Sequence, residues 1–476
     1  MADAYLPFAL TPTTRGTGTG DRRAVNVLPE PIVDPITQQP YYAVFKRAGL
    51  AASTQPPGGS AAARGVYHWD ATGNIYSVFA NKIYSGASDL GVTLAGSTGK
   101  CWFTDTPATS NEQILIISDG SDHYHVTTGG SITKYDENDD ANFPQSTLGP
   151  IHYIDGYILS SQSSGKVWNT GLGTFSTWAA SNFFSANAVG DALKGTALIK
   201  DRLIAFGSRS TEMHWNRGNP YGSPFFRQQQ NLQRHGIASI NTLAQVGDVL
   251  CYVGETPAGG DGGRSVWMMM GLESKELSNP VINRFLSAEG TSISSATAWI
   301  ERISGHLVYV LNLASADRTF VYDITSGAWA GEWEAAAGSA KFPAAYATSK
   351  AGVIYLQDAA NGRIYTASDT TYQDNSTTFT VTLQTEPSNY GTEGPKSFDE
   401  IHLDADLQAS GTATLTLSND EGANDITLGT FDLTSTHKVI RDCGTYQGKV
   451  RLKLTHAQNT AARFQGLRVF TSVGTY

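Results

Sequence analysis

Short apolar hairpins recur along the middle of the chain. They begin near residues 75, 115, 157, 203, 249, 307 and 353, so that successive starts lie 40 to 58 residues apart. Four of them share one unit, in which an apolar strand and a polar or glycine turn precede a basic residue and a β-branched/aromatic pair; the first is Ile75-Tyr76 with Lys82-Ile83-Tyr84. A repeat of this length made of short strands is typical of propeller blades, each too thin to bury both faces without its neighbours. An ordinary β-sandwich with coincidental hairpins is the alternative.

The pattern changes at both ends of this array. From residue 1 to about 60, Pro and Gly interrupt every apolar run, which predicts an extended N-terminal arm whose residues 41–45 add one strand to a neighbouring sheet. Beyond about residue 371, longer alternating strands predict a β-sandwich. We therefore predict an all-β chain made of an arm (1–60), a β-propeller of about seven blades (61–371) and a C-terminal β-sandwich (372–476).

Two segments inside the array lack strand alternation. Residues 225–235 are rich in Gln and Arg and indicate an excursion between blades. Residues 274–286 indicate an insertion with helical character, which accounts for the longest spacing between hairpins.

Composition limits the classes of function. Of 476 residues, 40% are apolar and 16% charged, and 43 acidic against 33 basic residues give a net charge of −10. This balance argues against a broad surface that grips nucleic acid, although a lumen past which DNA slides is compatible with it. Cys101, Cys251 and Cys443 are far apart, which predicts free thiols in a reduced compartment. We expect a soluble protein made in the cytoplasm, because no secretory signal or membrane span is apparent.

Candidate chemistry is sparse. Residues 95–101 resemble a phosphate-binding loop, but Leu94 stands at the first glycine position and Cys101 at the final Ser/Thr position. His123 and His125 share one strand face without a third metal ligand nearby, so we predict solvated histidines. Residues 418–422 match the first part of a turn that is common in sialidase-type propellers, but the match occurs a single time and lies outside the predicted blades. We predict no catalytic residue, no metal and no cofactor, and hence no enzyme.

Several strings spread over residues 25–470 resemble one protein family. In the arm they are Asn26-Val27-Leu28-Pro29-Glu30 and Arg47-Ala48-Gly49-Leu50, with Ala48 in place of a frequent proline. In the blades the most specific string is Asp201 to Ser208 followed by Thr211-Glu212. Together these strings resemble the tail hub proteins of short-tailed bacteriophages, also called packaged-DNA stabilisation proteins.

This resemblance implies a structural virion protein of the phage tail, made in the host cytoplasm. It implies a hexameric ring beneath the head-to-tail adaptor that extends and closes the DNA channel, retains packaged DNA until ejection, and holds tail spikes or fibres and a needle or plug. Double-stranded DNA would pass the lumen without sequence-specific binding. We expect the arm to be the assembly element, with contacts from six residues: Arg15, Arg22, Arg23, Asn26, Pro29 and Phe45.

The aromatic content favours an alternative function. The 21 Tyr and 9 Trp are suited to stacking on sugar rings, as in a carbohydrate-binding or carbohydrate-cleaving propeller that acts as a phage receptor-binding protein. Most of them stand at strand positions, where core packing explains them. A secreted kelch-like scaffold is a third possibility, against which the lack of paired cysteines counts.

Overall fold

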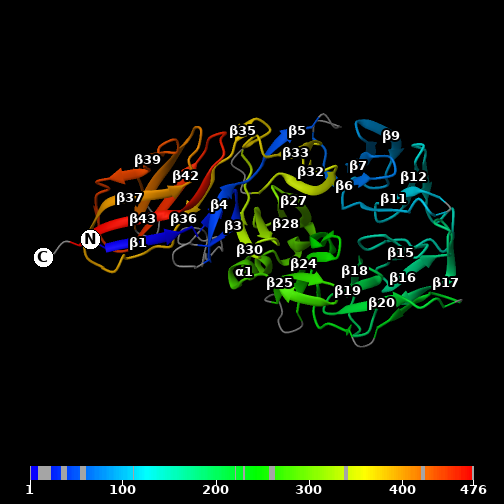
Figure 1. Ribbon diagram of the computed structural model, residues 1–476. Helices are drawn as coiled ribbons and strands as arrows, with labels where there is room; N and C mark the ends of the chain where they lie inside the picture. The colour runs from blue at the N-terminus through cyan, green and yellow to red at the C-terminus, as the bar shows by residue number, and fades with distance from the viewer. Residues whose placement is uncertain are drawn as a thin grey trace.

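The fold is a ring of small antiparallel sheets joined to a pair of longer sheets (Figure 1). The computed structural model describes residues 2–8, 23–33, 40–53, 60–110, 112–219, 221–228, 231–256, 263–336, 341–419 and 424–473. No helix in these ranges is long and apolar enough to cross a membrane. Both ends of the chain lie on the side of the longer sheets (Figure 1).

Six sheets of the ring are built from strands that follow one another in the sequence. The first three contain β6 (Ala63–Trp69), β7 (Asn74–Phe79), β8 (Lys82–Ser85) and β9 (Ser88–Thr93); β10 (Trp102–Asp105), β11 (Ile114–Ser118), β12 (His123–Thr127) and β13 (Ile132–Tyr135); and β14 (His152–Ile154), β15 (Tyr157–Ser161), β16 (Lys166–Thr170) and β17 (Trp178–Ser185). The next three contain β18 (Leu193–Ile199), β19 (Arg202–Gly207), β20 (Thr211–Asn216) and β21 (Phe225–Arg227); β22 (Gly236–Ile237), β23 (Ala244–Val246), β24 (Val249–Glu255), β25 (Arg264–Met270) and β26 (Glu273–Glu276); and β27 (Thr297–Ile303), β28 (His306–Leu313), β29 (Arg318–Asp323) and β30 (Ala328–Glu332).

The seventh sheet of the ring is completed from the N-terminal part of the chain. It contains β31 (Ala344–Lys350), β32 (Val353–Asp358) and β33 (Ile364–Ser368), followed by β5 (Gly49–Ala52), β34 (Gln373–Asp374) and β35 (Thr377–Thr378). The side chain of Gln357 in this sheet accepts from the main chain of Gly65 and donates to that of Val78, both in the first sheet, so the ring closes. The propeller prediction is confirmed.

The second strand of each blade explains the repeat in the sequence. In β11, Leu115 and Ile117 pack into a core shared with the first blade, whereas Ile114 and Ile116 pack with Ile158 of the third. Successive side chains point to opposite faces of a strand. A strand between two neighbouring blades therefore has to be apolar on both faces, and the predicted hairpins begin at these strands.

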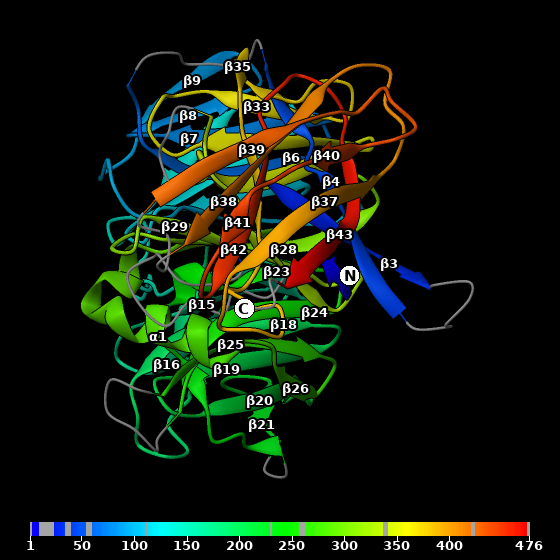
Figure 2. The same cartoon turned by 90° about the vertical axis from the view of Figure 1, so that its left-hand side faces the viewer.

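Two longer sheets enclose a second core; they lie beside the propeller in Figure 1 and in front of it in Figure 2. One contains β3 (Val27–Val33), β4 (Pro40–Lys46), β43 (Arg463–Val473), β37 (Lys396–Ala405) and β40 (Val439–Arg441), with β1 (Ala2–Pro7) paired to β43 and β41 (Thr445–Tyr446) to β37. The other contains β2 (Arg23–Val25), β36 (Val381–Gln384), β42 (Val450–His456), β38 (Thr412–Asn419) and β39 (Asn424–Asp432). The strand expected at 41–45 is β4. The predicted domain boundaries at residues 60 and 371 stay a prediction. β5, which precedes the first boundary, pairs with β33 and with β34, and β34 follows the second boundary, so one hydrogen-bonded sheet contains residues from both sides of each boundary.

Two segments that interrupt the strand pattern differ in structure. Residues 274–286 include the end of β26 and most of helix α1 (Pro280–Ala288), as the predicted insertion with helical character requires. Helix α1 is followed by the 3₁₀ turn η3 (Gly290–Ser295). A further 3₁₀ turn, η2 (Ile240–Thr242), lies between β22 and β23. The prediction of an excursion between blades at 225–235 is wrong for residues 225–227, because they form β21, the fourth strand of its blade. Three residues are too few for an alternating pattern to be visible in the sequence.

Candidate functional site

Strand β2 joins the propeller to the longer sheets. It pairs in parallel with β30 through Val25 and Glu332, and antiparallel with β36. The close approach requires a glycine at position 331, where φ is +90° and a Cβ would lie 2.1 Å from the carbonyl oxygen of Ala24. A sheet of the propeller thereby continues into a sheet of the second core without a break in hydrogen bonding.

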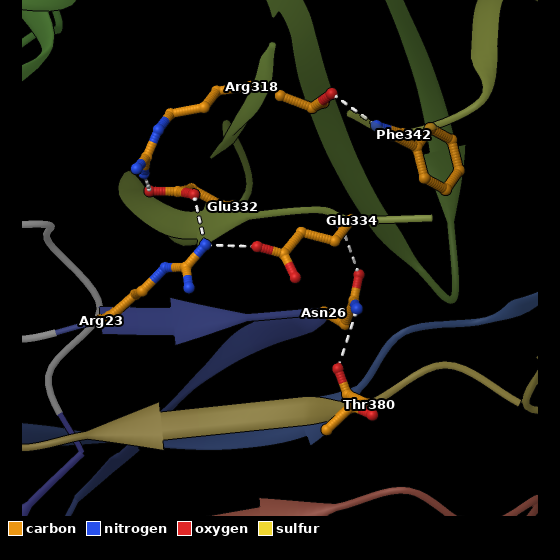
Figure 3. Close-up of polar contacts among 8 residues, drawn as sticks. Arg23, Asn26, Arg318, Glu332, Glu334, Phe342 and Thr380 are labelled. Carbon is orange, nitrogen blue, oxygen red and sulfur yellow. Dashed lines mark hydrogen bonds and ion pairs between the residues drawn. The ribbon is translucent and has the colours of Figure 1, made fainter. Parts of the chain in front are cut away.

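A charged cluster lies over this junction (Figure 3). The carboxylate of Glu332, which is 2% exposed, accepts from Arg318 at 2.7 Å and from Arg23 at 3.1 Å. Arg23 also pairs with Glu334. Burial acts to lower the pKa of Arg23, but the two carboxylates outweigh it and the pKa is raised. Strand β2 is thus attached to β29 and β30 by charge as well as by main-chain bonds.

Arg47 occupies the centre of the junction and is 1% exposed. Its guanidinium makes five hydrogen bonds, to Asn26 Oδ1, the carbonyl oxygens of Ala48 and Glu334, and both carboxylate oxygens of Asp374, at 2.6 to 3.0 Å. A guanidinium has five N–H donors, so every donor has a partner. The guanidinium carbon also lies 3.7 Å from the centroid of the Phe379 ring. A buried cation is tolerated when it is paired and fully hydrogen-bonded.

Asn26 forms the turn between β2 and β3 and organises the same cluster. Its φ is +59°, a left-handed conformation that asparagine adopts more readily than most residues. Besides accepting from Arg47, its Oδ1 accepts from the main-chain N–H of Glu334 at 2.9 Å, and its Nδ2 donates to the carbonyl oxygen of Thr380 at 2.9 Å (Figure 3). One side chain therefore connects the propeller, the N-terminal strands and β36.

A cavity of about 580 Å³ lies on the axis of the propeller. It is lined by residues from all seven sheets, among them the polar or charged Lys100, His152, Gln245 and Glu301. Burial lowers the pKa of Lys100 to about 7 and that of His152 to about 4, and it raises the pKa of Glu301. The Lys100 ammonium lies 4.0 Å from the ring centroid of Trp102. Among the described residues, no three His, Cys, Asp or Glu side chains are grouped to hold a metal ion.

The comparisons with known proteins bear on the whole propeller. The family described as Bacteriophage P22 Gp10, beta-propeller, matches residues 24–372. The chain belongs to this family. It is therefore a structural β-propeller protein of a bacteriophage, in the podovirus tail and DNA-stabilisation family. The match begins within β2 and ends just before β34, so this phage family includes the strands β2 and β5 that complete the junction and the ring.

The likenesses to solved structures are distant in sequence. Virginiamycin B lyase from Staphylococcus aureus, solved with quinupristin, is 12% identical, with a TM-score of 0.43 over 68% of this chain and 99% of that one. BamB from Moraxella catarrhalis is 14% identical, with a TM-score of 0.38 over 68% of this chain and 97% of that one. A search of curated proteins finds no match. Likenesses at this level do not bear on the function of the phage protein.

The residues expected to make assembly contacts fall into two groups. Arg15 and Arg22 lie outside the described residues. The other four make internal contacts: Arg23 and Asn26 as above, Pro29 buried in β3, and Phe45 with its ring 5.2 Å from that of His306. In this phage propeller these four residues therefore have contacts within their own chain, and their contact with an assembly partner stays a prediction.

Sequence reasoning missed the partners of these residues. Glu332, Asp374 and Arg318 lie about 300 residues from the arm, and nothing in their local pattern marks them. A signal was present in the string Arg47-Ala48-Gly49-Leu50, whose arginine lies between β4 and β5. The histidine prediction is wrong, because His123 and His125 are 1% and 6% exposed. They pack against aromatic rings, His123 on Phe143 at 4.8 Å.

Proposed function

We propose that the protein is a tail hub or nozzle component that extends and closes the DNA channel beneath the head-to-tail adaptor. In this role it retains packaged DNA until ejection and holds tail spikes or fibres and a needle or plug. Several copies, six by the family resemblance, form a ring whose lumen is the DNA path. The role is mechanical and non-enzymatic, as the phage structural family supports.

The size of the axial cavity supports a lumen between copies rather than within one. A DNA duplex is about 20 Å wide and rises about 3.4 Å per base pair, so one base pair occupies about 1,000 Å³. The cavity on the propeller axis holds about 580 Å³ in all. A single propeller is therefore a wall element. Its net charge of −10 suits a wall on which DNA slides without binding.

The observation that carries the proposal is the junction. The N-terminal strands β2 and β5 are hydrogen-bonded into sheets of both the propeller and the C-terminal part, and Arg47 is fixed by five hydrogen bonds at the point where they meet. Domains joined by a linker alone move relative to each other. A chain interlocked in this way is a stiff spacer, as a channel that resists the pressure of packaged DNA requires.

Reconstitution with the head-to-tail adaptor tests the proposal. We expect the purified protein to form rings on the adaptor, visible by electron microscopy, with a mass by light scattering that corresponds to six copies. Protein that stays monomeric and unattached in the presence of the adaptor would contradict it. In parallel, filled particles assembled without this protein should lose their DNA to added nuclease, and particles that receive the purified protein should keep it.

A further inference from the structure

The outer edges of the propeller blades differ in how they are protected. Edge strands present unpaired main-chain groups, which proteins usually shield with charges, short length or a covering segment. Blades six and seven are covered, because β2 pairs with β30 and β5 with β33. Four other outermost strands carry charged residues: Asp89 in β9, Lys134 in β13, Arg227 in β21, and Glu273, Lys275 and Glu276 in β26. Strand β17, with eight residues, has no charge.

Strand β17 is the edge strand of its sheet, and its pairing with β16 on the inner side is irregular. Phe183 to Ser185 are in register with Trp168 to Lys166, and Trp178 is in register with Thr170. The four residues between them, 179–182, have no register partner in β16, a strand that the structure describes in full. Ala179, Ala180 and Ser181 are exposed. On its outer side β17 has no strand partner among the described residues, so main chain is available at the rim of the third blade, on the side of the molecule away from the longer sheets (Figure 1).

A slot of about 500 Å³ separates this edge from the outermost strand of the next blade. Five aromatic side chains line it: Phe183, Phe184, Tyr221, Phe225 and Phe226. Tyr221 is 85% exposed and Phe226 42%, and Trp215 beside them is 37% exposed. Among the described residues only Tyr5 is another aromatic side chain exposed to this degree. Exposed aromatic residues gathered at one place mark interaction surfaces.

The rim of the slot is positively charged, although the chain as a whole is acidic. The Lys166 ammonium lies 4.0 Å from the ring centroid of Phe183, and the Arg217 guanidinium lies 5.6 Å from that of Phe226. Arg227 is exposed on β21. In the described part of the chain, none of these three cations has a carboxylate within salt-bridge distance. They are therefore available to an anionic partner.

We propose that this slot binds an extended acidic segment of another protein, which adds to the edge of β17 as a fifth strand of the third blade. Added strands bind through main-chain hydrogen bonds, and pockets for alternate side chains give specificity. The same chain already accepts β2 and β5 in this way on two other blades. Acidic side chains complement Lys166, Arg217 and Arg227, and the aromatic walls receive the apolar side chains between them. A glycan would use the aromatic faces, but it would not continue the ladder of main-chain hydrogen bonds as an added strand does. The role in channel closure does not depend on this surface.

A defined peptide tests the proposal on the full chain. The probe is a fluorescent nine-residue peptide in which glutamate alternates with valine, compared with one in which lysine alternates with valine. We expect only the acidic peptide to bind, as measured by fluorescence anisotropy up to millimolar protein. Hydrogen exchange of the amides of residues 179–185 should slow when it is bound. An acidic peptide with N-methylated valines should bind at least tenfold more weakly, because it lacks main-chain donors.

Variants locate the binding site. The double variant Arg217→Glu with Arg227→Glu should lower the affinity for the acidic peptide at least tenfold. The control variant Arg209→Glu, at an exposed position between β19 and β20, should leave this affinity unchanged. Three results would each overturn the proposal: no binding of the acidic peptide, binding without protection of residues 179–185, or equal affinity of the N-methylated peptide. Binding of an oligogalacturonate that the double variant abolishes, without binding of the peptide, would make the slot a glycan site instead. Ring formation on the adaptor is a separate measurement, so either proposal can fail alone.

Discussion

Arg47 and Asp374 form a bidentate ion pair across 327 positions of sequence, with Nη1 and Nη2 donating to the two carboxylate oxygens at 2.9 and 2.6 Å. Both side chains are buried, at 1% and 7% exposure. Arg47 lies between β4 and β5, and Asp374 ends β34, which pairs with β5. The ion pair thus fixes the N-terminal strand in the seventh blade at the place where the chain leaves the propeller.

Removing one partner of this pair should destabilise the protein strongly. In Arg47→Met the carboxylate of Asp374 stays buried without its cation, so we expect the free energy of unfolding to fall by about 3 to 5 kcal/mol, measured by urea denaturation. The double variant Arg47→Met with Asp374→Leu should recover part of this loss, because no charge is left buried. Lys200→Met, which removes one side of the exposed Lys200–Asp248 pair, is the control and should change stability by less than about 1 kcal/mol. A loss of that small size in Arg47→Met would refute the importance of the pair.

Two variants of Asn26 separate its side chain from its backbone conformation. Asn26→Gly keeps an easy left-handed turn but loses the hydrogen bonds to Arg47, Glu334 and Thr380. Asn26→Ala loses the same bonds and adds the cost of a left-handed alanine, about 1 to 2 kcal/mol. We expect both to destabilise, with Asn26→Ala lower by about this amount in the free energy of unfolding. Equal stabilities would show that the turn relaxes when the side chain is removed.

Gly331 is the position at which β2 approaches β30. In Gly331→Ala the new Cβ meets the carbonyl oxygen of Ala24, so β2 must shift, and we expect faster hydrogen exchange in residues 23–25 and 381–384. Gly327→Ala is a matched control in the same hairpin, because its φ is also positive, at +70°, but no atom lies within 4 Å of its Cβ. The control should lose about 1 to 2 kcal/mol without local opening. Similar exchange in both variants would mean that the contact with Ala24 does not hold the junction.

The propeller was predictable because its signal is local and repeated. Each second strand is apolar on both faces, as Ile114 to Ile117 illustrate, and the repeat spacing makes the pattern visible along the chain. The insertion was visible for the same reason, since α1 interrupts this spacing. The short β21 was missed because three residues cannot show alternation.

The candidate site was only half predictable, for a physical reason. The arm residues Arg23 and Asn26 are predicted to contact partners outside the chain, and this stays a prediction. Their contacts within the chain, with Glu332, Glu334 and Thr380, come from segments 308 to 354 residues away, and such pairings leave no periodic trace in either segment. His123 and His125 illustrate the same limit, because alternate spacing places two rings on one face without showing whether that face is covered.

Buried histidines should make the fold sensitive to mild acid. Burial lowers the pKa of His123 to about 3 and the pKa values of His125 and His152 to about 4, and the charge of His125 contributes to the shift at His123. In the unfolded chain each has a pKa near 6.5, so below that pH the unfolded state binds protons that the folded state does not. The stability from neutral burial is therefore complete above about pH 6.5 and is lost as the pH falls toward the folded values. When the pH is lowered from 7.5 to 5.5, each of these three histidines should decrease the free energy of unfolding by about 1.4 kcal/mol.

His152→Gln isolates one of these contributions. A glutamine amide can keep the hydrogen bond that the His152 Nε2 shares with Thr196 Oγ1 at 3.2 Å, but it does not titrate. The difference in unfolding free energy between pH 7.5 and 5.5, measured by urea denaturation, should therefore shrink by about 1.4 kcal/mol in this variant, whatever its stability at pH 7.5. If the wild-type and variant curves stay parallel over this range, His152 takes up its proton equally in both states and is not held neutral by the fold. Because His152 lines the axial cavity, that result would also mean that water reaches the ring from the propeller axis.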